Sequence, residues 1–154
     1  MARVLIVYDS KTGHTGAMAN AIAEGARSVK TVSVDLRKLG EPFPMTLLDN
    51  ADAIIIGSPT HYANVTTEMK TFLEAIKELK KAGRLKLQGK IGAAFGSYGW
   101  DGGWNLQNLE VEMKALGIKI ENPIVEAVDI PSEKALKACL ALGKTIAEKI
   151  AKQK

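Results

Sequence analysis

Three short runs of branched apolar residues constrain the fold of this chain more than any other feature. They span Arg3–Tyr8, Ala53–Gly57 and Ile91–Phe95. Each run is too short for a helix, and its continuous apolar character is typical of a strand that is buried on both faces. Two further strands are predicted at Thr31–Leu36 and Ile124–Val128.

Amphipathic helices are predicted between and after these strands. Apolar residues recur at helical spacing in four segments: Met18, Ala21, Ile22 and Gly25; Met69, Phe72, Leu73 and Ile76; Leu106, Leu109, Met113 and Leu116; and Leu136, Cys139, Leu140, Ile146 and Ile150. Pro42 and Pro44 interrupt the segment after the second strand, so a loop or a short helix is expected near Met45–Asp49.

Buried strands that are joined by helical crossovers form a parallel sheet, and the right-handed crossover rule leaves few topologies. We therefore expect an α/β fold of three layers (α/β/α), and a single domain over residues 1–154. No internal repeat or linker divides the chain.

Composition narrows the possible functions. Lys and Arg outnumber Asp and Glu by 21 to 17, which gives a net charge of +4. This charge favours acidic partners, but aromatic residues make up 5% of the chain and do not alternate with basic ones, so nucleic-acid binding is not predicted. The sequence has neither a stretch of about 20 apolar residues nor a signal peptide, so we expect a cytoplasmic protein that does not enter a membrane. No metal site is predicted, and Cys139 is interpreted as a small buried hydrophobe.

Ligands of such folds bind outside the carboxyl ends of the strands, where the strand order reverses. The first loop at this edge, Asp9–Thr15, surrounds a helix start near His14 with hydroxyls, a glycine and two potential cations. Free backbone amides and the helix dipole attract an anion there, and the spacing suits a monophosphate better than a nucleoside triphosphate or a dinucleotide. An ordinary capped helix explains the same residues equally well.

The second loop, Gly57–Asn64, contains Pro59 and the flat side chains of His61 and Tyr62. These rings are suited to cover a heterocycle, although a connecting loop with scattered aromatic residues is the alternative. The third loop, Gly96–Trp104, collects both tryptophans, one of the three tyrosines and four glycines. Large rings in a glycine-rich loop need a packing partner. A flavin ring would provide one, and the neighbouring helices are the alternative, which we favour for Trp104.

These loops resemble those of the flavodoxin family, in the same order and across nearly the whole chain. Ser10–Thr15 resembles the phosphate loop of that family. Gly57–Thr60 resembles its second flavin loop, above all in quinone reductases and flavodiiron proteins, and Ser97–Trp100 is similar to the third loop of flavodiiron modules. The resemblance implies a flavodoxin-like fold with a five-stranded parallel sheet of order 2-1-3-4-5.

The resemblance also implies flavin mononucleotide (FMN) as the cofactor, with its phosphate held by the first loop and its ring packed by Tyr62 and Trp100. The implied cofactor-binding residues are Ser10, Lys11, Thr12, Gly13, His14, Thr15, Ser58, Pro59, Thr60, His61, Tyr62, Ala63, Asn64, Ser97, Tyr98, Gly99, Trp100, Asp101 and Gly102. The positive charge of Lys11 and His14 is expected to favour the reduced, anionic flavin.

The expected function is electron transfer between redox partner proteins, among which the resemblance suggests a diiron or iron-sulfur protein. In this role no catalytic residue is needed, because FMN carries the chemistry. The alternative is an NAD(P)H:quinone reductase that uses the same FMN, although the chain is short for the segments that build a nicotinamide and quinone pocket. A phospho-receiver or a phosphatase of related topology is disfavoured, because Ser58–Pro59 ends the third strand and Cys139 lies in the last helix.

Overall fold

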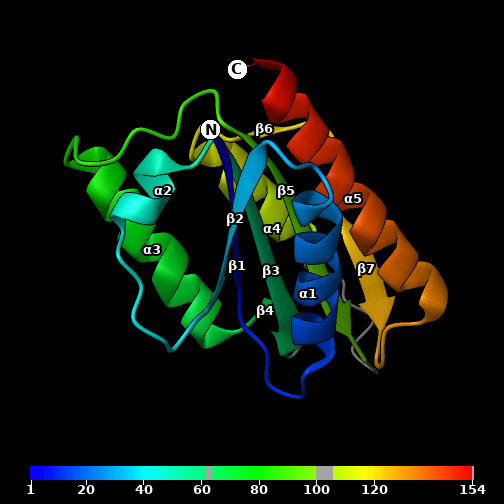
Figure 1. The fold of residues 1–154 in the computed structure, drawn as a ribbon. Coiled ribbons are helices and arrows are strands. Elements are labelled where there is room, and N and C mark those ends of the chain that lie inside the picture. The colour runs from blue at the N-terminus through cyan, green and yellow to red at the C-terminus, as the bar shows by residue number, and fades with distance from the viewer. Residues whose placement is uncertain (62–63, 100–105, 154) are drawn as a thin grey trace.

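The computed structural model describes residues 1–61, 64–99 and 106–153. Its central sheet is parallel, with neighbouring strands in the order β2-β1-β3-β5-β6 (Figure 1). The strands of this path are β1 (Ala2–Tyr8), β2 (Val32–Lys38), β3 (Ala53–His61), β5 (Ile91–Tyr98) and β6 (Lys119–Ile120). A further strand, β7 (Val125–Val128), also pairs with β5 in parallel. The predicted strand order and three-layer α/β/α fold are confirmed.

The strand predicted at Ile124–Val128 is the second of two pieces along the same edge of β5. β6 pairs with Ile91–Gly92, and β7 pairs with Phe95–Tyr98. Pro123 lies between the two pieces and has no backbone N–H to donate, so the ladder is interrupted there. Within residues 1–61, 64–99 and 106–153 the sheet therefore has seven strands, where five were expected. The remaining addition is β4 (Asn64–Val65), which pairs antiparallel with the end of β3.

The helices are α1 (His14–Arg27), α2 (Thr46–Asn50), α3 (Thr67–Lys81), α4 (Asn108–Ala115) and α5 (Glu133–Gln153). In Figure 1, α1 and α5 lie side by side on one face of the sheet. Alternate strand residues point to opposite faces. Thus Ile6 and Ile55 pack in the hydrophobic cluster with α1 and α5, whereas Leu5 and Ile54 pack in the cluster with α3 and α4.

Two segments that were predicted as loops are partly strand. β3 continues through Ser58, Pro59 and Thr60 to His61, and β5 continues through Ser97 to Tyr98. The two strands stay paired in this region, with Pro59 opposite Ser97. Proline is tolerated there because it stands near the end of the strand, where the loss of one N–H costs little pairing.

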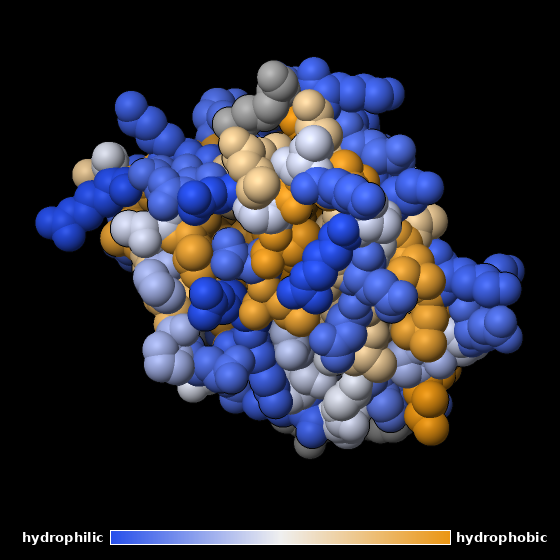
Figure 2. Space-filling view, in the orientation of Figure 1, coloured by the Kyte–Doolittle hydropathy of each residue, from blue (hydrophilic) through white to orange (hydrophobic). Residues whose placement is uncertain are grey.

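The surface is mostly hydrophilic on the face seen in Figure 2, with apolar residues scattered between charged ones. In the part of the chain that the structure describes, no helix has the length and apolarity needed to cross a bilayer.

Candidate functional site

The three predicted loops meet at the carboxyl edge of the sheet around a cleft of about 380 Å³. This volume lies within the usual range of small-molecule sites. The residues that line it are Lys11, Thr12 and His14 from the first loop, Pro59 and Thr60 from the second, Thr66 before α3, Ser97, Tyr98 and Gly99 from the third loop, and Asp129 after β7. The sequence thus predicted the position of the cleft and most of its described lining.

The first loop presents backbone amides at the start of α1. Gly13 caps this helix with φ +92°, in the left-handed region that glycine adopts without strain. The Ser10 hydroxyl oxygen accepts the amides of Gly13 and Gly16, each at 3.2 Å. Among the described residues, nothing accepts the amides of Lys11, Thr12, His14 or Thr15. Four free donors at a helix N-terminus suit an anion.

A buried pair of hydroxyls joins the first loop to the third. Thr15 Oγ1 lies 2.7 Å from Ser97 Oγ, and these residues are only 1% and 4% exposed. Two hydroxyls that share one hydrogen bond use one of their two protons, and no other described group accepts the second. A buried donor without an acceptor is costly, so this proton calls for an acceptor on a ligand in the cleft.

The second loop is held from within the protein. Ser58 is fully buried; its hydroxyl donates to the Pro59 carbonyl at 2.8 Å and accepts the Thr66 amide at 3.3 Å. Thr66 in turn caps α3, because its side-chain oxygen accepts the Met69 amide. Asn64 does not line the cleft; it borders a neighbouring groove of about 450 Å³ between α3 and α4.

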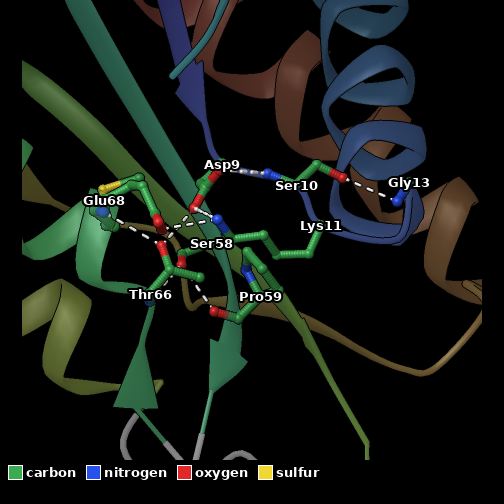
Figure 3. Close-up of polar contacts among 9 residues, drawn as sticks. Asp9, Ser10, Lys11, Gly13, Ser58, Pro59, Thr66 and Glu68 are labelled. Carbon is green, nitrogen blue, oxygen red and sulfur yellow. Dashed lines mark hydrogen bonds and ion pairs between the residues drawn. The ribbon is translucent and has the colours of Figure 1, made fainter. Parts of the chain in front are cut away.

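A buried carboxylate lies beneath the first two loops (Figure 3). Asp9 is 4% exposed; its Oδ1 accepts the Ser10 amide at 2.9 Å, and its Oδ2 accepts the Thr66 hydroxyl at 2.5 Å. The Lys11 ammonium lies 2.8 Å from Glu68 and 3.8 Å from Asp9. The hydrogen bond between Lys11 and Glu68 raises the pKa of Lys11 and lowers the pKa of Glu68. The charge of Lys11, which was expected to act on the cofactor, is therefore already engaged by two carboxylates.

The third loop enters the cleft beside the end of β7. The Asp129 amide donates to the Tyr98 carbonyl at 2.7 Å, and Asp129 adopts a positive φ of 53°. A Cβ at Gly99 would lie 3.0 Å from the Asp129 carboxylate, so the loop passes close to this acid. The predicted contacts Tyr62, Ala63, Trp100, Asp101 and Gly102 lie outside the described residues, and His61 is placed only as the last residue of β3.

Sequence reasoning missed three polar residues at this edge: Asp9, Thr66 and Asp129. Asp9 and Asp129 each directly follow a strand, so their position after β1 and β7 was a usable signal. Thr66 stands three residues before Met69 in an N-cap pattern, which was also readable.

Glu126 in β7 provides a test of the electrostatics of this sheet edge. Burial and, to a smaller extent, the charge of Glu110 raise the pKa of this half-buried residue, and Gln107 donates to its carboxylate at 2.8 Å. An acid with a higher pKa in the folded chain destabilises that state once the pH exceeds its unfolded pKa. We expect Glu126→Gln to raise the free energy of unfolding by up to about 0.5 kcal/mol at pH 7. This gain should vanish at about pH 3, where the glutamate is protonated. Urea unfolding at both pH values measures this; an equal gain at both would contradict it.

The comparisons with known proteins agree with this geometry. A family model described as flavodoxin matches residues 6–143. The chain belongs to the flavodoxin family. A solved flavodoxin from the domain Archaea is 34% identical with a TM-score of 0.84, and the match covers 97% of this chain and 99% of that one. Rubredoxin oxygen:oxidoreductase from Desulfovibrio gigas is 29% identical with a TM-score of 0.85, over 97% of this chain and 36% of that one.

One curated relative of this flavodoxin is an enzyme. It is an NAD(P)H dehydrogenase (quinone) from Acidithiobacillus ferrooxidans, 38% identical over 114 residues. The match covers 62% of this chain and 56% of the relative, so a little over half of that enzyme's length is represented.

The predicted cofactor is confirmed with the family, because flavodoxins are FMN-binding flavoproteins. The described residues fit such a group. The four free amides at the start of α1 and the unused hydroxyl proton of the Thr15–Ser97 pair suit a phosphate. A Cβ at Gly13 would meet no atom within 4 Å, so the space over the helix start is open.

Proposed function

We propose that this flavodoxin transfers electrons between proteins by means of FMN held in the cleft at the carboxyl edge of the sheet. The observation that carries the proposal is the set of unpaired donors beside this cleft, above all the buried Thr15–Ser97 pair with its unused proton. Bound FMN supplies the redox chemistry, while the protein binds it, orients it and excludes water.

The residues of the chain take different parts in this role. The amides of the first loop and the hydroxyls of Ser10, Thr12 and Thr15 hold the phosphate. Pro59 and Thr60 at the end of β3 and Tyr98 and Gly99 at the end of β5 border the ring, and the predicted ring packing by Tyr62 and Trp100 stays a prediction. No described residue is needed as a catalytic acid or base.

A visible spectrum before and after adding FMN tests this function. We expect uptake of one FMN per chain with a Kd below about 1 µM, and a shifted flavin absorption band on binding. The purified chain should also bind riboflavin, which lacks the phosphate, more weakly. Absence of FMN uptake would reject the proposal.

An NAD(P)H:quinone reductase is the second candidate, because the curated enzyme relative is 38% identical to part of the chain. Oxidation of NADPH with benzoquinone by the FMN-loaded protein distinguishes the two roles. Turnover far above that of free FMN would favour the reductase, whereas turnover at the rate of free FMN would favour the carrier.

For partners, we propose redox proteins that contain a diiron or iron-sulfur centre. The support is the resemblance of Ser97–Trp100 to flavodiiron modules and the similarity of the fold to part of rubredoxin oxygen:oxidoreductase. A pull-down with the FMN-loaded chain should recover such a protein, and recovery of no redox protein would count against it. The cytoplasmic location and the single-domain organisation stay predictions.

A further inference from the structure

Asp9 is a buried charge that the proposed cofactor contacts do not use. It directly follows β1, and its carboxylate links the phosphate loop to the residue before α3, since Oδ1 accepts the Ser10 amide and Oδ2 accepts the Thr66 hydroxyl (Figure 3). Because Thr66 also caps α3, the carboxylate connects the start of that helix to the phosphate loop. Two hydrogen bonds to one buried carboxylate hold its position.

Lys11 does not cancel this charge. Its ammonium is closer to Glu68, at 2.8 Å, than to Asp9, at 3.8 Å. Asp9, Lys11 and Glu68 contain two carboxylates and one ammonium, so this cluster, which we call the Asp9 cluster, has one net negative charge. Lys11 and Glu68 are half exposed and screened by water, whereas Asp9 is buried and screened much less.

The Asp9 cluster borders the cleft, because Lys11 and Thr66 both line it. The other titratable side chains among the described lining are His14, Tyr98 and Asp129, and Asp129 is a further carboxylate at this cleft. The charge next to the cleft thus has the opposite sign to the one expected from Lys11 alone.

We propose that Asp9 is a positioning residue whose buried negative charge, only partly balanced by Lys11, weakens the binding of reduced FMN relative to oxidised FMN. This inference rests on the proposed function. Reduced, anionic flavin carries more negative charge than oxidised flavin, while the phosphate is the same in both. The ratio of the two dissociation constants, Kd for reduced FMN over Kd for oxidised FMN, therefore reports the charge that acts on the ring, and its change in a variant gives the contribution of the residue that was replaced.

The experiment measures both constants for the full chain, with oxidised FMN in air and with dithionite-reduced FMN under argon. Asp9→Asn keeps the size of the side chain and removes its charge, so the ratio should fall about tenfold. A tenfold change corresponds to a rise of about 30 mV in the two-electron reduction potential. Lys11→Met should raise the ratio several-fold, and Glu68→Gln should lower it several-fold, because Lys11 is then free to pair with Asp9.

Glu78→Gln is the matched control, since it makes the same chemical change ten residues further along α3, about 15 Å from Glu68. Its ratio should equal that of the wild type. An unchanged ratio in Asp9→Asn, or equal weakening of both redox forms, would overturn the inference and leave FMN binding by the wild type intact. If Asp9→Asn does not fold, the ratios measured for Lys11→Met and Glu68→Gln test the inference. Ratios that equal that of the wild type, or that change in the same direction in both variants, would overturn the inference. A wild type that takes up no FMN would reject both proposals.

Discussion

Replacement of Gly143 by alanine is expected to lower the free energy of unfolding by about 3 kcal/mol, at the upper end of the usual cost of overpacking. Gly143 lies where α5 crosses α1, and a Cβ there would overlap the Ile22 carbonyl oxygen and lie 3.0 Å from the Ala26 amide nitrogen. Both neighbours are backbone atoms of a helix, so the clash is relieved only by separating α1 from α5. Urea unfolding followed by far-UV circular dichroism measures the loss.

Gly16→Ala is the control for this substitution, because Gly16 also lies in a helix. A Cβ there would meet Ser10 Oγ at 3.4 Å and Tyr8 Cε2 at 3.6 Å, which are contacts that need little movement. Alanine favours the helix by about 1 kcal/mol over glycine, so this variant should be as stable as the wild type or more stable. A loss below about 0.5 kcal/mol in Gly143→Ala would show that the two helices do not approach as closely as described.

The layers of this fold could be predicted because local patterns specify them. Continuous branched runs such as Ala53–Gly57 can be buried only in the middle of a sheet, and the apolar spacing around Met69 and Phe72 fixes the inner side of α3. The crossover rule then leaves few sheet orders, and the resemblance to flavodoxins implied which of them this chain adopts. The carboxyl edge was predictable for the same reason, and with it the position of the cleft.

The ends of the strands were less predictable, because pairing with a neighbour decides them. Pro59 indicates a turn when read locally, yet it lies opposite Ser97 in a continuing ladder. The site contacts depend on residues that are distant in the sequence. Thr15 and Ser97 are 82 positions apart, and Thr66 and Asp9 are 57 apart. The sequence therefore placed Lys11 at the phosphate because of its neighbours in the loop. Its nearest acid in the structure, Glu68, belongs to α3, which is distant in the sequence.

The hydroxyl pair leads to the second large effect. We expect Ser97 to donate to Thr15 Oγ1, so that the Thr15 proton is the one left for the phosphate. Thr15→Val keeps the shape of the side chain and removes this donor. A hydrogen bond to a charged group contributes about 1.5–3 kcal/mol, and we therefore expect the Kd for FMN to rise about ten- to a hundredfold. Fluorescence quenching of FMN on titration with protein measures this constant.

Two further variants separate hydroxyl chemistry from packing at this position. Thr15→Ser keeps the hydroxyl and removes one methyl group, so it should restore the affinity to within about threefold of the wild type, even if it costs about 1 kcal/mol of stability. Thr145→Val, at an exposed position of α5, should leave the Kd unchanged. If Thr15→Ser binds FMN as weakly as Thr15→Val does, the methyl group and not the proton matters. The unused proton of the Thr15–Ser97 pair would then have no part in holding the cofactor.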